Sequence, residues 1–198
     1  MTTQSNPKPI ALMLLDRDGV INFDSPDYIK SAAEWQPIPG ALLSIAELNA
    51  AGIHTALCSN QAGIGRGRLT ASALAAIHVR LEQELASQNG HLDLWRYCPH
   101  LPEAGCGCRK PASGMLDDCM REFGIPPSAC AFVGDSLKDM QAAITSGCLP
   151  IFLRTIADAA SAPDLEDKVR ALGVTHIADS LAAAVATLKA NGFRSSAW

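Results

Sequence analysis

The feature that most constrains the fold of this chain is a repeated alternation between short apolar runs and segments with helical spacing. Apolar runs of about four to eight residues are typical of buried strands and are short for helices. Strands are predicted at residues 10–15, 53–58, 92–98, 129–135, 149–153 and 174–179. Helices are predicted at residues 39–52, 70–89, 113–124, 136–147 and 180–192, with Thr70 as a capping residue. The alternation predicts an α/β fold with a mostly parallel sheet covered on both faces.

Length and composition indicate a soluble globular protein. The 198 residues are 48% hydrophobic and carry a formal net charge of -4. We expect one domain over residues 1–198, with a core at about residues 10–190. A slightly acidic chain lacks the basic balance that nucleic-acid binding requires, and no stretch approaches the roughly 18 apolar residues of a membrane span. The first ten residues do not have the zones of a signal peptide. We therefore expect a cytoplasmic monomer with no nucleic-acid or membrane partner.

Acidic residues follow two of the predicted strands. Asp16 and Asp18 come after the first strand, and Asp135 comes after the fourth. The carboxyl ends of parallel strands meet at one edge of a sheet, where ligand sites form. Two carboxylates two residues apart in an extended segment point to one side and repel each other unless a cation joins them, and Mg²⁺ is a cation of this kind. Taken singly, these acids are also explained as turn residues or a helix cap.

Groups suited to phosphate follow the second predicted strand. Ser59 stands at its end, with Asn60 and Gln61 behind it in a glycine-rich segment. A hydroxyl and neighbouring backbone N–H groups can hold phosphate oxygens. Arg66 and Arg68 offer guanidinium groups that bind phosphate in a bidentate manner. Glycine-rich loops and surface arginines are common, so this segment alone is a weak indication.

Four soft metal ligands lie within the eleven residues of "CPHLPEAGCGC": Cys98, His100, Cys106 and Cys108. The two members of each i, i+2 pair point to one side of an extended backbone. Three thiolates and one imidazole complete a tetrahedral zinc shell with no open position, which predicts a structural Zn²⁺ site. A redox pair of Cys106 and Cys108, or three free thiols, are the alternatives. An odd total of seven cysteines without an export signal favours metal binding over disulfides.

Two cations, Arg109 and Lys110, directly follow the last of these ligands. A loop clamped by zinc is rigid without a hydrophobic core of its own, so we expect it to hold both cations where a substrate phosphate arrives. The alternative is that they are surface charges that balance the thiolates. The other four cysteines lie in apolar or helical contexts and are expected to be buried side chains of the core: Cys58, Cys119, Cys130 and Cys148.

Four segments together resemble, in order, the four motifs of the haloacid dehalogenase phosphatase superfamily. They are "LLDRDG", "CSNQAG", "CRKP" and "FVGDSLKDM", and the resemblance covers about residues 10–188. It implies a Rossmann-like three-layer fold with a minimal cap or none. It also implies Mg²⁺-dependent hydrolysis of a phosphomonoester through an aspartyl-phosphate.

The matched positions imply a role for each motif residue. Asp16 is the nucleophile, and Asp18 protonates the leaving alkoxide and then activates water. Mg²⁺ is held by Asp16, Asp135 and the backbone carbonyl of Asp18. Ser59 and Lys110 bind the transferring phosphoryl group. Asp139, four residues after Asp135, is expected to support the site without binding the metal.

The cysteine loop within this scaffold resembles two groups of the superfamily, the D-glycero-D-manno-heptose 1,7-bisphosphate 7-phosphatases and the histidinol-phosphate phosphatases. The short "CPHLP" loop resembles the second group. The segments "KPASGML", "NQAGIGRG" and "GDSLKDMQAA" resemble the first, which we favour, with a small phosphorylated sugar as the substrate. The only obvious insert after the first motif spans residues 20–37. We expect specificity to come from that insert and the neighbouring loops, with Arg66 or Arg109 contacting the phosphate that is not cleaved.

Two functions of other classes compete with a phosphatase. A non-catalytic zinc module would need an exposed binding surface or, for nucleic acid, basic charge. A phospho-acceptor signalling domain also places acids at the ends of parallel strands. Asp18 argues against the second function, because it supplies the proton transfers that turnover requires.

Overall fold

The computed structural model of the chain describes residues 8–154 and 164–195. The polar start of the chain, where no signal peptide is predicted, lies mostly outside these residues. Within them, a parallel six-stranded sheet has the strand order β3-β2-β1-β4-β5-β6. The strands are β1 Leu12–Leu15, β2 His54–Asn60, β3 Leu94–Cys98, β4 Cys130–Gly134, β5 Leu149–Leu153 and β6 His176–Ala178. The predicted α/β class with a parallel sheet is confirmed.

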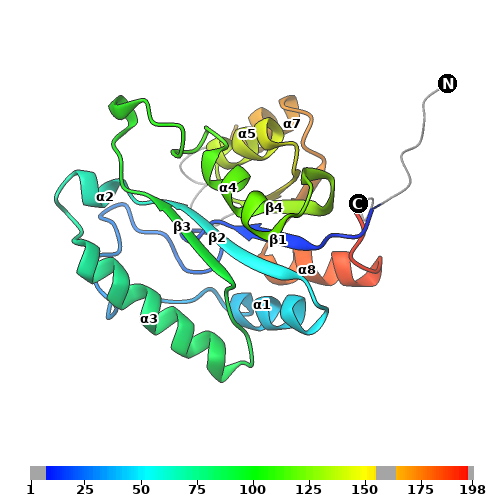
Figure 1. The fold of residues 1–198 in the computed structure, drawn as a ribbon, viewed down its shortest axis with the longest axis horizontal. Coiled ribbons are helices and arrows are strands. Elements are labelled where there is room, and N and C mark those ends of the chain that lie inside the picture. Colours follow the sequence, from blue (N-terminus) through cyan, green and yellow to red (C-terminus); the bar gives the residue numbers. More distant parts are fainter. Residues whose placement is uncertain (1–7, 155–163, 196–198) are drawn as a thin grey trace.

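Helices cover both faces of the sheet (Figure 1). They are α1 Ala41–Ala50, α2 Ala62–Gly65, α3 Ala71–Ser87, α4 Gly114–Phe123, α5 Leu137–Ser146, α7 Leu165–Ala171 and α8 Leu181–Ala190. One face packs against α1, α3 and α8, and the other against α4, α5 and α7, which makes three layers. None of these helices in the described ranges is long and apolar enough to cross a bilayer.

Strand β1 shows why its apolar run is continuous. Leu12 and Leu14 pack beneath α4 and α5, whereas Met13 and Leu15 pack on the side of α1, α3 and α8. All four side chains are fully buried. Successive side chains of a strand point to opposite faces, so a strand with helices on both sides needs apolar residues at every position.

The predicted end of β2 differs from the structure. β2 was predicted to end at Cys58 but continues through Ser59 and Asn60, which pair with Tyr97 and Cys98 of β3. A polar side chain ends the apolar pattern without ending the backbone ladder, so the sequence pattern placed the boundary two residues early. Sequence patterns also predicted neither α2, a single turn in the glycine-rich segment, nor α7.

The helix α3 follows its sequence pattern closely. The Thr70 hydroxyl accepts the backbone N–H of Ala73 at 3.1 Å, which confirms the predicted cap. The face that packs on the sheet consists of Leu74, Ile77, Leu81 and Leu85. The spacing of three and four residues places these side chains on one stripe.

The strand order reverses at β1. The chain runs from β1 outward to β2 and β3, and then returns to place β4 on the other side of β1. Loops that leave two such strands diverge and open a crevice at their carboxyl ends. Asp16 and Asp135 stand at this point, directly after β1 and β4. Residues 16–40 between β1 and α1 contain no helix or strand beyond isolated bridges, in agreement with the expected minimal cap.

Candidate active site

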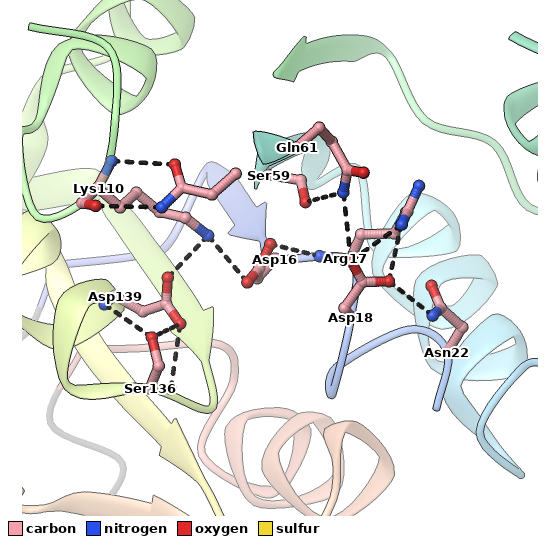
Figure 2. A network of polar contacts seen from close by, with 10 residues as sticks. Asp16, Arg17, Asp18, Asn22, Ser59, Gln61, Lys110, Ser136 and Asp139 are labelled. Atoms are coloured by element: carbon pink, nitrogen blue, oxygen red, sulfur yellow. Dashed lines mark hydrogen bonds and ion pairs between the residues drawn. The ribbon is translucent and has the colours of Figure 1, made fainter. Parts of the chain in front are cut away.

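Lys110 joins two acidic residues at the end of β1. Its Nζ lies 2.9 Å from Asp16 Oδ2 and 2.7 Å from Asp139 Oδ1 (Figure 2). The side chains of Lys110 and Asp139 are each 1% exposed, and that of Asp16 is 13% exposed. The other oxygen of Asp16 accepts the backbone N–H of Arg17 at 2.7 Å. The loop after β3 thus brings its lysine to Asp16 at the end of β1.

Burial and charge shift the ionisation of this pair. Burial is the largest influence on Asp16 and raises the pKa of its carboxyl to about 6, because the nearby carboxylates of Asp139 and Asp18 add to the effect and outweigh Lys110. Burial lowers the pKa of Lys110, but Asp139 and Asp16 outweigh burial and raise it overall. The lysine is therefore a cation. The raised pKa of Asp16 shows that one ammonium group does not balance the surrounding carboxylates.

Asp135 adds its carboxylate to this acidic cluster. Asp16, Asp135 and Asp139 each place one oxygen so that all three atoms lie within 4.8 Å of one another. Gly19, with φ +78°, makes room for Asp135, because a Cβ at this glycine would lie 1.7 Å from Asp135 Oδ2. Carboxylate oxygens are the ligands that Mg²⁺ prefers, so the residues present fit this ion.

Asp139 has a second set of contacts that fix its position. Its Oδ2 accepts the backbone N–H of Ser136 at 3.1 Å and the Ser136 hydroxyl at 2.6 Å, and the same hydroxyl accepts the N–H of Asp139. This reciprocal capping box begins α5. Gly134 lets the backbone approach closely, because a Cβ there would lie 2.3 Å from the Cβ of Asp139. One oxygen of Asp139 therefore belongs to the helix cap, and the other faces Lys110.

Asp18 is held by four hydrogen bonds. Oδ1 accepts Nε of Arg17 and Nδ2 of Asn22, each at 2.9 Å. Oδ2 accepts Nη2 of Arg17 at 2.9 Å and Nε2 of Gln61 at 3.2 Å. Arg17 is 1% exposed, and its bidentate pair fixes the plane of the carboxylate. Arg17 and Asn22 were missed as site residues. The position of Arg17 between Asp16 and Asp18 at the end of a strand could have indicated that it belongs to the site.

The end of β2 contributes the predicted phosphate-binding residues. The Ser59 hydroxyl is 1% exposed and accepts Nε2 of Gln61 at 3.0 Å. Asn60 binds the backbone of Lys110 twice, donating to its carbonyl and accepting its N–H, each at 3.1 Å. Ser59, Gln61 and Lys110 are thus brought together beside Asp16 and Asp18 (Figure 2), and Asn60 lies against the backbone of Lys110.

The two predicted arginines lie outside this cluster. Arg109 donates to the carbonyl of His100 at 3.2 Å and is tied to the cysteine loop. Arg66 stands at the end of α2, where it lines a pocket with Arg68. Among the described residues, neither arginine forms a hydrogen bond or ion pair with Asp16, Asp18 or Lys110.

The predicted zinc ligands meet in space. Sγ of Cys98 lies 3.6 Å from that of Cys106 and 3.4 Å from that of Cys108, and the last two lie 3.4 Å apart. Nδ1 of His100 lies 3.5 Å from Cys98 Sγ and 3.3 Å from Cys108 Sγ. Zinc–sulfur bonds of about 2.3 Å imply tetrahedron edges of roughly 3.7 Å, so the cluster fits a closed Zn²⁺ shell. No disulfide joins Cys106 to Cys108 in the structure.

The cysteine loop is connected to the rest of the site on two sides. The N–H of Gly65 in α2 donates to the carbonyl of Pro99 at 3.1 Å, and the N–H of Gly114 donates to that of Gly107 at 3.1 Å. Within the same loop, Lys110 follows Cys108 by two residues and is bound by Asn60. The cysteines outside the loop are buried, as predicted: Cys58, Cys119, Cys130 and Cys148.

Comparisons with known proteins agree with this geometry. A sequence model of the haloacid dehalogenase-like hydrolases matches residues 9–147. A D-glycero-beta-D-manno-heptose-1,7-bisphosphate 7-phosphatase of Pseudomonas aeruginosa is 47% identical over 145 residues, which cover 73% of this chain and 82% of that protein. A D-glycero-alpha-D-manno-heptose-1,7-bisphosphate 7-phosphatase of Mycobacterium bovis is 36% identical over 66% of this chain and 70% of its own length.

A solved structure is similar along nearly the whole chain. It is the D,D-heptose 1,7-bisphosphate phosphatase of B. bronchiseptica in complex with magnesium and phosphate, with a TM-score of 0.81 and 37% identity. The match covers 92% of this chain and 99% of that structure. Fold, motif residues and sequence similarity together lead to one conclusion: the chain belongs to the haloacid dehalogenase-like hydrolases.

Proposed function

We propose that this protein is a Mg²⁺-dependent phosphatase that removes the 7-phosphate of D-glycero-D-manno-heptose 1,7-bisphosphate. The observation that carries the proposal is the cluster of Asp16, Lys110 and Asp135 at the ends of β1 and β4. The relatives described above are named for this activity, and the similar structure was solved with magnesium and phosphate. These names favour the heptose substrate over histidinol phosphate.

The first half of the reaction uses both acids of the first motif. A carboxylate oxygen of Asp16 attacks phosphorus, the bond from phosphorus to the sugar oxygen breaks, and an aspartyl-phosphate forms. Asp18 gives a proton to the departing alkoxide. Ser59 and Lys110 hold the oxygens of the phosphoryl group during this transfer, which depends mainly on positioning and charge neutralisation.

The second half releases phosphate. Asp18, now unprotonated, takes a proton from a water molecule, the water oxygen attacks phosphorus, and the carboxylate of Asp16 is regenerated. Asp16, Asp135 and the backbone carbonyl of Asp18 would hold a bound Mg²⁺, which would supply positive charge to the phosphoryl oxygens. Asp139 positions Lys110 and the start of α5 and does not bind the ion.

The zinc loop has a structural role in this proposal. A closed shell of four protein ligands leaves no position for substrate, so its contribution is rigidity. Through it, Lys110 and Arg109 are held on the side of the site that faces the incoming phosphate. Segment 20–37, the α2 segment and the zinc loop surround an open site, and they are the parts that select the substrate. A cytoplasmic monomer without nucleic-acid or membrane partners stays a prediction.

The deciding experiment measures phosphate release with Mg²⁺ from both anomers of D-glycero-D-manno-heptose 1,7-bisphosphate, with histidinol phosphate in parallel. Both anomers are needed because the relatives include enzymes named for each. We expect kcat/KM to be at least tenfold higher for one bisphosphate anomer than for histidinol phosphate, with Asp16→Asn as the inactive control. A preference for histidinol phosphate would refute the assignment of the heptose bisphosphate as the substrate. Absence of Mg²⁺-dependent turnover on any phosphomonoester would favour the non-catalytic alternatives, a zinc module or a phospho-acceptor.

A further inference from the structure

Every acceptor position of the Asp18 carboxylate is occupied by an N–H donor (Figure 2). Oδ1 accepts Nε of Arg17 and Nδ2 of Asn22, and Oδ2 accepts Nη2 of Arg17 and Nε2 of Gln61. A carboxylate has about four lone-pair sites, so a proton or a leaving-group oxygen can reach Asp18 only where one donor withdraws. The arrangement of the four donors therefore decides which oxygen takes part in proton transfer.

Gln61 is the donor best placed to withdraw. Its bond to Asp18 Oδ2 is 3.2 Å long, whereas each of the other three bonds is 2.9 Å long. The same nitrogen also donates to the Ser59 hydroxyl at 3.0 Å, so it keeps a partner when a leaving-group oxygen replaces it at Asp18. These contacts make Oδ2 the oxygen that is open to proton exchange.

Among the residues that the structure describes, the guanidinium group of Arg17 bonds to Asp18 alone. The side chain is 1% exposed, and its third nitrogen, Nη1, is buried without a hydrogen-bond partner. A buried arginine that served only the fold would gain free energy by bonding to nearby carbonyls as well, because unpaired buried N–H groups are costly. The fold therefore tolerates a cost at Nη1 while it holds the bidentate pair with Asp18.

The backbone of Arg17 fixes the geometry around both acids of the first motif. Its N–H donates to Asp16 Oδ1 at 2.7 Å. Its carbonyl accepts the N–H of Ile21 at 2.8 Å and that of Asn22 at 3.1 Å, which turns the chain back and brings the Asn22 side chain to Asp18. Asn22 is fully buried, so both donors to Oδ1 come from one compact turn and cannot shift independently.

We propose that Arg17 is a positioning residue for proton transfer, which, together with Asn22, holds the Asp18 carboxylate so that Oδ2 alone exchanges the proton. When the phosphoryl group moves to Asp16, the leaving alkoxide takes the proton from Oδ2. When water attacks the aspartyl-phosphate, the same oxygen takes a proton from the water. The inference rests on the proposed function for the role of Asp18, and it does not depend on which sugar phosphate is cleaved.

Two phosphate esters with different leaving groups test this role. The alkoxide of D-glycero-D-manno-heptose 1,7-bisphosphate needs a proton to leave, whereas p-nitrophenolate leaves without one. The measured quantity is kcat/KM for the heptose ester divided by kcat/KM for p-nitrophenyl phosphate, each followed as initial release of the leaving group. This ratio does not depend on the fraction of enzyme that is folded, because both substrates report on the same active molecules.

Arg17→Met is expected to lower the ratio at least tenfold, because it removes both guanidinium donors from Asp18. Arg17→Lys keeps the charge but not the bidentate geometry, so its ratio should lie between those of Arg17→Met and the wild type. Arg96→Gln is the matched control, because it removes an arginine of β3 that pairs with Asp118, and it should keep the wild-type ratio. An unchanged ratio in Arg17→Met would overturn the proposal even if both activities fell, because equal losses mark a purely structural role.

Asp18→Asn separates failure of this inference from failure of the proposed function. A lower ratio in Asp18→Asn with an unchanged ratio in Arg17→Met would refute the inference alone. An unchanged ratio in both variants would refute the acid role of Asp18 as well. Phenyl phosphate, whose leaving group is more basic than p-nitrophenolate, replaces the heptose ester if that sugar is not the substrate. Absence of turnover on all three esters would overturn the inference together with the proposed function.

Discussion

The ammonium group of Lys110 lies 2.9 Å from the carboxylate of Asp16 in a position with almost no solvent access. The lysine comes from the loop after β3, and the aspartate follows β1. Opposite charges at this distance attract strongly when water is excluded. Even so, the pKa of Asp16 is raised to about 6, because burial and the carboxylates of Asp139 and Asp18 oppose ionisation. The site is therefore short of positive charge, which is the condition for binding a metal ion.

Asp16→Asn should abolish activity and at the same time stabilise the fold when no Mg²⁺ is added. The Asp16 carboxyl has its ordinary pKa of 3.8 in the unfolded chain and a pKa of about 6 in the folded protein. The folded state therefore loses stability as pH rises from about 4 through 6. Removing the charge should raise the free energy of unfolding by roughly 3 kcal/mol at pH 8 and by little at pH 4. Urea unfolding of the wild type and of Asp16→Asn at both pH values checks the change in stability. A kinetic assay should show that kcat of the variant falls at least about 10⁴-fold.

Asp118→Asn is the matched control for that experiment. The Arg96 guanidinium group, together with Arg121, holds the pKa of the Asp118 carboxyl below its usual range. This substitution should therefore lower stability slightly at pH 8, because the pair is partly exposed. A loss of stability in Asp16→Asn comparable to that in the control would contradict the charge argument.

Gly19→Ala should weaken Mg²⁺ activation. The added Cβ would lie 1.7 Å from Asp135 Oδ2, so the carboxylate must rotate away from Asp16. We expect the Mg²⁺ concentration for half-maximal activity to rise about 10- to 100-fold. Gly52→Ala is the control, because Gly52 also has a positive φ but no atom within 4 Å of its added Cβ. Both variants should lose about 1 kcal/mol of stability through backbone strain, and equal Mg²⁺ dependence in the two would exclude the steric explanation.

Cys106→Ser should remove zinc and displace Lys110. With one thiolate missing the tetrahedral shell is incomplete, and segment 98–110 loses the clamp that holds its lysine against Asn60. We expect less than a tenth of the wild-type zinc content by metal analysis, a lower Tm, and a fall in kcat/KM of at least tenfold. Cys130→Ala changes a buried cysteine outside the loop and should retain its zinc. Loss of zinc with wild-type turnover and substrate affinity would show that the loop does not anchor the cation.

His78→Gln should reduce the sensitivity of the fold to acid. Burial, with a smaller effect of Arg17, lowers the pKa of His78 to about 4. The unfolded histidine has its ordinary pKa of 6.5 and takes up a proton first, so stability falls as pH decreases from 6.5 towards 4. The loss amounts to less than about 3 kcal/mol, because part of the ring is exposed. Chemical unfolding at pH 7.5 and 5 should show a smaller difference for the variant than for the wild type or for His91→Gln, a surface control.

The elements of the fold were predictable where one local pattern sufficed. The continuous apolar residues of β1 predicted a strand buried on both faces, and Thr70 predicted the start of α3. The helix α7 was not predicted, because within Leu165–Ala171 only Val169 is buried and the segment carries little apolar periodicity. Helices of this kind form through packing on a neighbour and ion pairs, which a local pattern does not contain.

For the site, the sequence by itself determined which chemical groups stand at the strand ends and the spacing of the zinc ligands. Motif spacing places Asp16 and Asp18 on one strand end, because neighbours along a chain have few relative positions. Only the tertiary structure decided that Arg17 is buried against Asp18, and that Lys110 reaches Asp16 from a loop more than ninety residues away. The pocket between Tyr28 and Arg66 likewise arises from packing of two loops that are distant in sequence. Contacts between remote segments depend on sheet order and on the shape of the packed core, and these are properties of the whole chain.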